Sequence, residues 1–173
     1  MKRASKIFIV IVTLILSFHA AAQNKKPRIS PADTARGMIG KANVVITYSK
    51  PSVKDRKIWG VLVPYDSVWR AGANEATTFE ADRDVTVEGH LLPAGKYAFF
   101  ILPKERGKWV VIFNKVFQQW GAFKYDKSQD QLRVPVTPVA VARKTELLTY
   151  TINPKGFSLT WENVNLPVRI EPK

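Results

Sequence analysis

Short runs of apolar residues, separated by turn residues, dominate the chain beyond residue 40. Their spacing follows the two-residue period of β-strands rather than the longer period of helices. The run at 96–103 is apolar on both faces, which predicts a central strand, and the run at 108–115 is its natural hairpin partner. The predicted strands lie at 43–49, 77–81, 85–87, 96–103, 108–115, 131–137, 146–152, 157–162 and 166–171.

Many short strands in one chain of this size predict an all-β fold. An antiparallel β-sandwich or jelly roll is the first expectation, and a closed barrel is the alternative. Pro135 and Pro167 fall within predicted strands. Because proline has no backbone N–H to donate to a neighbouring strand, both residues predict edge strands. Helix signals are confined to two single turns, at 30–33 and 116–120.

The first 22 residues have the composition of a secretory signal peptide: three basic residues, an apolar run at 7–18 and small residues ending at Ala22. That run is shorter than the roughly 20 apolar residues of a spanning helix, and an uncleaved anchor is the alternative. Cleavage predicts an exported protein, periplasmic or extracellular, without a transmembrane segment. Residues 23–173 would form a single all-β domain whose core begins at about residue 28.

The chain contains no cysteine, which excludes disulfides, thiolate metal ligands and a cysteine nucleophile. Beyond the signal segment its one histidine is His90, in a tight turn where no partner is spaced for a zinc site or a catalytic relay. The acidic pair at 82–84 is also interpreted as a turn, because the other ligands of a calcium loop are missing. The sequence therefore predicts neither a metal site nor a cofactor.

The net charge favours an anionic partner. Loss of the three basic residues at positions 2, 3 and 6 with the signal peptide takes the formal charge from +13 to +10. Acidic glycans, lipid head groups or other envelope components fit this surplus, whereas export and the lack of a motif argue against nucleic acid. A basic surface that serves only solubility is the alternative.

The tryptophans fall into two groups. Trp109 and Trp161 share strand faces with other apolar residues and are predicted to lie in the core. Trp59 and Trp120 lie among polar residues, and each precedes a glycine. Such side chains can present a flat face to a sugar ring, or they can plug the open end of a sandwich, and both interpretations stay open.

The stretch at 68–89 begins and ends like a strand but is interrupted by Arg-Ala-Gly-Ala-Asn-Glu-Ala at 70–76. One interpretation is a tied turn: Gly72 can take a positive φ, Asn74 tolerates one and can tie the turn with its amide, and Arg70 can pair with Glu75 or Asp66. In that case Arg70→Ala should lower the melting temperature. The other interpretation is a ligand site, in which case the melting temperature should stay level or rise. The residues that would share this cleft are Asp55, Arg56, Trp59, Arg70, Asn74, Glu75 and Trp120.

Three segments, at 48–78, 87–103 and 109–126, resemble a family of exported bacterial proteins classified only as a domain of unknown function, DUF2911. The run VWRAGANEAT, at 68–77, is the most specific of the shared patterns. The resemblance covers nearly all of the chain after the signal segment. It implies an all-β domain, but it supplies no activity and no catalytic residue.

Three function classes follow from these observations, and whether the protein is an enzyme stays open. The first is an exported binding protein for an acidic glycan or another envelope component, with the basic loops and the two Trp-Gly turns as its surface. The second is a glycan hydrolase with Glu75 as acid or base and Asp55 or Asp66 as the second carboxylate. The third is a structural or assembly factor that pairs through a sheet edge. Neither the ligand nor the oligomeric state can be read from these patterns.

We expect the exported chain to begin at Gln23, because small residues precede it in the pattern that signal peptidase recognises. Cell fractionation followed by N-terminal mass spectrometry tests this. An intact chain beginning at Met1 in the cytoplasm would contradict it.

Overall fold

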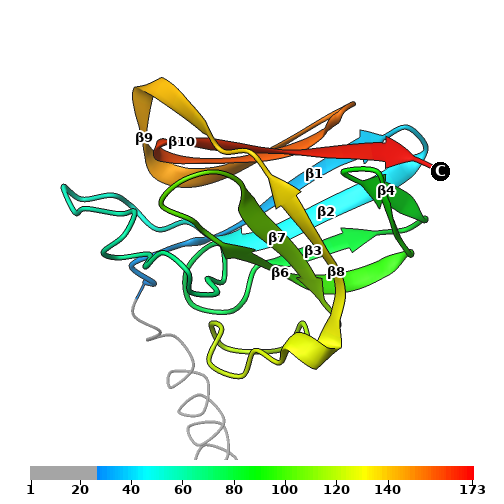
Figure 1. Cartoon of the computed structure of the whole chain (residues 1–173), viewed down its shortest axis with the longest axis horizontal. Helices are drawn as coiled ribbons and strands as arrows, with labels where there is room; N and C mark the ends of the chain where they lie inside the picture. Colours follow the sequence, from blue (N-terminus) through cyan, green and yellow to red (C-terminus); the bar gives the residue numbers. More distant parts are fainter. Residues whose placement is uncertain (1–26) are drawn as a thin grey trace, which may run out of the picture.

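The computed structural model describes residues 27–173, and the predicted signal peptide lies outside the described residues. Two antiparallel sheets pack face to face, which confirms the all-β prediction (Figure 1). One sheet has six strands in the order β1-β2-β3-β6-β7-β8, and the other has four in the order β5-β4-β10-β9. The strands are β1 (Ala32–Ile39), β2 (Ala42–Ser49), β3 (Thr78–Ala81), β4 (Val85–Val87), β5 (His90–Leu92), β6 (Gly95–Leu102), β7 (Trp109–Asn114), β8 (Asp130–Val136), β9 (Val139–Asn153) and β10 (Gly156–Pro172).

The predicted helical turns at 30–33 and 116–120 are wrong. β1 begins at Ala32 and pairs with β2 along its whole length, from Ala32 opposite Ser49 to Ile39 opposite Ala42. In the described part of the chain, the one helical element is a 3-10 turn, η2 (Lys127–Gln129). The Asp126 carboxylate caps this turn by accepting a hydrogen bond of 2.8 Å from the Ser128 backbone N–H.

The two strand prolines have different positions. Pro135 lies in β8, an edge strand of the six-stranded sheet, as predicted. The edge prediction for Pro167 is wrong, because β10 has neighbours on both sides. Pro167 falls between the pairing of β10 with β9, which ends at Asn165, and its pairing with β4, which begins at Ile170. At that position the missing N–H of proline removes no hydrogen bond from either ladder.

The main core lies between the two sheets and is rich in aromatic rings. Trp109 and Trp161 are buried there, as predicted. Trp59 packs at 4.7 Å from Trp109 and 5.9 Å from Trp161, measured between ring centroids. Trp69 stacks on Trp161 at 5.7 Å. These four rings form one continuous tryptophan cluster, which holds the loops at 53–69 against both sheets.

A second, smaller core lies on the other face of the six-stranded sheet. Ala98, Phe100 and Ile112 are completely buried there. The segment between β7 and β8 lies on this side, away from β9 and β10 (Figure 1), and Phe117 and Tyr125 from it cover the buried side chains. Burial on both faces explains why the run at 96–103 is apolar throughout. It also holds the β7–β8 segment beside the interrupted stretch at 70–76.

We expect Gly156→Ala to destabilise the protein by more than about 3 kcal/mol, because the added methyl group at the start of β10 would overlap the Val168 carbonyl near the other end of the same strand. Gly107→Ala is the matched control. Gly107 also has a positive φ, of 80°, but nothing lies within 4 Å of the added atom. That control should cost only about 1 kcal/mol. Urea unfolding of both variants measures the difference, and equal losses would contradict this account of the hairpin.

Candidate functional site

The interruption at 70–76 is a turn with an unusual backbone. The prediction of a positive φ is wrong for Gly72 and confirmed for Asn74, which has φ 60°; Ala71 also has a positive φ, of 53°. Glycine is required at position 72 for another reason, namely close approach. A Cβ atom there would lie 2.8 Å from the Thr77 hydroxyl oxygen and 3.2 Å from the Ser49 carbonyl oxygen. The turn is therefore pressed against the end of β2.

Hydrogen bonds from distant elements hold this backbone in place. Ala71 is fully buried, and its carbonyl oxygen accepts from the hydroxyl groups of Thr77, at 3.0 Å, and Tyr150, at 2.8 Å. Burial raises the pKa of the Tyr150 hydroxyl well above its usual value, so the group remains a donor at neutral pH. The Asn74 side-chain amide donates to the Ser30 carbonyl at 3.1 Å and to the Ser49 hydroxyl at 3.2 Å.

Arg70 does not form the predicted ion pair with Glu75 or Asp66. Glu75 instead binds Arg28 through two hydrogen bonds of 2.7 and 2.8 Å, and Asp66 pairs with Lys104. Arg70 donates to the Asn74 carbonyl at 3.3 Å, but its Nε is buried and has no partner among residues 27–173. Burial lowers the pKa of the Arg70 guanidinium below its usual value. Arg70 is thus a half-buried cation without a carboxylate partner in the described chain.

Arg70 lines a cavity of about 360 Å³, which we call the basic pocket. Lys54 and Arg56 also line it, and none of its lining residues is acidic. The indole Nε1 of Trp161, another lining residue, is buried and lacks a hydrogen-bond partner within the described chain. The polar lining residues are Ser30, Ser52, Lys54, Arg56 and Arg70, and the aromatic ones are Trp69 and Trp161.

A second cavity, of about 640 Å³, lies on the outer face of the six-stranded sheet, and we call it the outer pocket. Thr47, Thr78 and Lys96 contribute from β2, β3 and β6, and residues 117–120 form another part of the lining. The Arg28–Glu75 pair lines it as well, with about half of each side chain exposed. The Glu75 and Trp120 backbones meet in an isolated bridge, so the turn positions this pocket too.

The remaining sequence candidates are dispersed. Trp59 is only 9% exposed and belongs to the tryptophan cluster, so its ring packs in the core and is not an exposed aromatic surface. Asp55 is exposed on the loop after β2, with φ 53°, and Asp66 lies with Lys104. Of the carboxylates considered for hydrolysis, Glu75 lines the outer pocket, and neither Asp55 nor Asp66 lines the outer or the basic pocket.

Sequence reasoning missed several residues of both pockets. Arg28 lies 47 positions from Glu75, and no local pattern connects them. Gln119 could have been included through its neighbour Trp120, since both belong to the polar stretch FQQWG. Lys54 precedes Asp55 and Arg56 directly, and only its contribution to the basic charge was considered.

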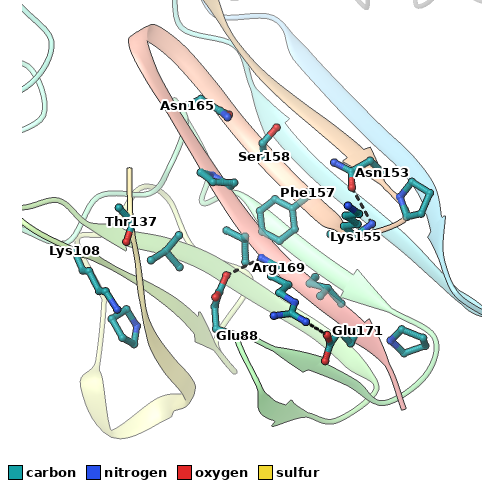
Figure 2. Close-up of a pocket in the computed structure, with 18 residues that line it drawn as sticks. Glu88, Lys108, Thr137, Asn153, Lys155, Phe157, Ser158, Asn165, Arg169 and Glu171 are labelled. Carbon is teal, nitrogen blue, oxygen red and sulfur yellow. Dashed lines mark hydrogen bonds and ion pairs between the residues drawn. The ribbon is translucent and has the colours of Figure 1, made fainter. Parts of the chain in front are cut away.

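A larger cavity, of about 850 Å³, lies where β8 approaches β10 (Figure 2). Several of its polar groups are already paired. Arg169 binds Glu171 through its side chain, and its backbone N–H donates to Glu88 at 2.7 Å. Likewise, the Lys155 backbone N–H donates to the Asn153 side chain at 2.8 Å. None of the buried unpaired atoms of the described chain belongs to a residue lining this cavity, and we place the candidate site at the basic and outer pockets, which adjoin the turn at 70–76.

Among residues 27–173, no group of three or more histidine and acidic residues is arranged to hold a metal ion. The same part of the chain has no helix with the length and apolar character that a membrane crossing requires.

Fold and site together define an all-β domain of two antiparallel sheets, with a polar turn that shapes two pockets at the end of β2. The family model of DUF2911, described as a protein of unknown function, matches residues 30–170. The chain belongs to this family. No curated protein and no solved structure matches this chain.

We expect Tyr150→Phe to cost about 1–2 kcal/mol, because the Ala71 carbonyl loses one of two donors in a buried setting. Thr77→Val removes the other donor. The double variant should lose more stability than the two single losses together, since a buried carbonyl is then left without either hydroxyl. Tyr97→Phe, which removes a hydrogen bond to the Pro93 carbonyl at a part-buried turn, is the control. Additive losses in the double-mutant cycle would refute the shared role.

Proposed function

We propose that this protein is an exported binding protein and that its basic pocket holds an anionic group of an envelope component, in the first place an acidic glycan. The single observation that carries the proposal is Arg70. Its guanidinium is half-buried without a carboxylate partner in the described chain, and its Nε is buried and unpaired. A carboxylate, sulfate or phosphate would supply the missing acceptor.

The energetic argument rests on desolvation. Removing a charged group from water costs several kcal/mol in a protein unless a partner compensates for it. An arginine that serves only the fold is expected to have that partner within the chain. Arg133 shows the contrast: its side chain donates to Asp130 at 2.7 Å and to Tyr125 at 2.6 Å. Arg70 lacks an acidic partner of this kind in the described chain, as expected of a side chain that binds a ligand.

The chemistry of the pocket favours an anion over other ligands. Arg70 Nε and Trp161 Nε1, two donors of its lining residues, have no acceptor in the described chain, and none of the lining residues is acidic. The planar guanidinium group matches the geometry of carboxylate and phosphate oxygens. Lys54 and Arg56 add positive charge, and the formal charge of +10 that remains when the three basic residues of the signal peptide are subtracted from +13 adds long-range attraction.

Binding is supported better than hydrolysis. The hydrogen bonds from Arg28 lower the pKa of Glu75 below its usual value, so Glu75 stays ionised at neutral pH and is unsuited to donate a proton. Asp55 and Asp66 do not line the outer pocket with it. The pair of carboxylates that glycoside hydrolysis requires is therefore not assembled around this residue.

We expect Arg70→Gln to weaken binding of the anionic ligand at least about 30-fold, which corresponds to about 2 kcal/mol for losing one partner of a buried charge pair. Isothermal titration calorimetry at low salt would use oligogalacturonate for carboxylates, dextran sulfate for sulfates and phosphatidylglycerol vesicles for a phosphate on a lipid surface. Arg106→Gln is the control, because it removes the same charge from the exposed turn between β6 and β7. Absence of binding to all three probes, or equal losses in both variants, would refute the proposal.

We expect Arg70→Met to melt at or above the temperature of the parent protein, because the change keeps most of the apolar stem and removes an uncompensated buried charge. Arg133→Met should instead lose about 1–3 kcal/mol, since the buried Asp130 carboxylate loses its ion-pair partner and keeps only the neutral donors Asn114 and Tyr125. Differential scanning calorimetry compares the two variants. A large loss of stability in Arg70→Met would favour the tied-turn interpretation over the ligand site.

A further inference from the structure

The lining of the basic pocket includes exposed apolar side chains, which the binding of an anion alone does not require. Ile29, from the lead-in to β1, is 85% exposed, and Leu62 is 42% exposed; both line the pocket beside Lys54 and Arg56. Val61, next to Leu62 in the chain, is 60% exposed. These aliphatic side chains can neither form hydrogen bonds with a glycan nor offer it an aromatic face. Their exposure therefore indicates contact with an apolar phase or partner.

The loop between β7 and β8 brings two exposed aromatic rings close to the same pocket. A Cβ atom on Gly121 would lie 2.5 Å from Arg70 Nη1 and 3.2 Å from two ring carbons of Phe123, so this ring is near the cation of the basic pocket. Phe123 is 83% exposed, and Trp120, which directly precedes Gly121, is 56% exposed. The exposed apolar side chains of the three segments together form what we call the apolar rim: Ile29, Val61, Leu62, Trp120 and Phe123.

Positive charge accompanies the apolar rim without acidic partners to balance it. Lys54, Arg56 and Lys57 lie on the exposed loop after β2, and Lys124 is exposed on the β7–β8 loop. None of these four cations forms an ion pair among residues 27–173. Asp55 is the one acidic residue between positions 54 and 57. The surface thus combines protruding apolar side chains with an excess of positive charge.

We propose that the apolar rim docks on a lipid bilayer whose surface carries anionic head groups. The aromatic rings lie at the level of the head groups, where tryptophan is favoured, and the aliphatic side chains reach the boundary with the acyl chains. The four cations lie against the anionic head groups, and the lysine stems can be buried while their ammonium groups stay at the surface. A protein interface fits this surface less well, because lysine is depleted at such interfaces.

The inference rests on the proposed function in one respect. Ile29 and Leu62 belong to the apolar rim and also line the basic pocket, so docking brings that pocket to the membrane. The anionic envelope component that the pocket is proposed to hold would then be one presented at the membrane surface. The docking itself requires only the apolar rim and the cations beside it.

Vesicle binding by protein purified from the exported fraction tests the role of the apolar rim. The rim variant is Ile29→Ser/Phe123→Ser, which changes two highly exposed side chains. Met38→Ser/Leu91→Ser is the control, because it removes two exposed apolar side chains near the β1–β2 turn and in β5, away from the lead-in to β1 (Figure 1). We expect the rim variant to weaken binding to phosphatidylglycerol vesicles at least about tenfold and the control to change it less than about twofold.

The role of charge is tested in the same way. The parent protein should bind phosphatidylcholine vesicles at least about tenfold more weakly than phosphatidylglycerol vesicles. Lys57→Gln/Lys124→Gln should weaken binding to phosphatidylglycerol at least about fivefold. Lys41→Gln/Lys155→Gln removes the same charge from the exposed turns that join β1 to β2 and β9 to β10, and it should change binding less than about twofold.

Insertion can be measured directly through Trp120, because the other four tryptophans belong to the tryptophan cluster of the core. Bromine atoms on acyl chains quench tryptophan fluorescence at contact. Brominated phosphatidylglycerol should therefore quench the parent protein, and Trp120→Phe should lose most of this quenching. Vesicle binding without quenching would overturn the insertion of the apolar rim.

The remaining outcomes also decide the inference. Failure to bind phosphatidylglycerol vesicles at low salt overturns it, and so do equal losses in the rim variant and its control. Self-association that only the rim variant abolishes, without vesicle binding, would assign the surface to a second copy of the chain instead.

Soluble oligogalacturonate separates this inference from the proposed function, because its binding should depend on Arg70 and stay within about twofold in the rim variant. If vesicle binding depends on the apolar rim but no acidic probe depends on Arg70, the docking stands and the proposed function fails. If an acidic probe depends on Arg70 but vesicle binding does not depend on the apolar rim, the proposed function stands and the docking fails.

Discussion

Asn74 is the point on which the geometry of both pockets depends. Its side-chain amide binds the lead-in segment at Ser30 and the end of β2 at Ser49. Its carbonyl oxygen accepts from the Gly121 backbone N–H at 3.0 Å and from Arg70 at 3.3 Å. The residue adopts a positive φ, which asparagine tolerates better than most side chains. One residue thus fixes the relative positions of the N-terminal segment, the sheet and the loop that carries Trp120.

The strands were largely predictable, because alternation of apolar and polar residues is a local property of the sequence. β1 and the three-residue β5 were missed, and the strands predicted at 157–162 and 166–171 form the single strand β10. In β1, half of the positions are exposed, and its sequence ADTARGMI contains small and charged residues where the other strands have β-branched ones. Pairing with β2 forms this strand in spite of its weak intrinsic preference. Tertiary structure also explains why Pro167 lies in an interior strand. At its position β10 pairs with neither β9 nor β4, so the missing N–H breaks no hydrogen bond.

The site was predictable in its location but not in its connections. The polar residues at 70–76 marked the turn, and the glycine within it suggested where the backbone bends. The positive φ is at Asn74, as predicted, and at Ala71 rather than Gly72. Hydroxyl groups from Thr77 and Tyr150 stabilise Ala71 in a conformation that local sequence would assign to glycine. The partner of Glu75 could not be predicted from local sequence. Arg28 is distant in the chain, and only the folded sheet brings the two charges together.

Burial of the central strands on both faces has a consequence for how the molecule moves. β6 and β7 are covered on one side by the main core and on the other by the smaller one, and Phe100 and Ile112 are completely inaccessible. Amide protons in these strands can exchange with solvent only when the whole domain opens, whereas those of the exposed Trp120 loop need only a local opening. The central strands and the Trp120 loop therefore fluctuate in different ways, the strands by opening of the whole domain and the loop by local opening. The loop can adjust its shape around a guest molecule while the sheet beneath it keeps its register.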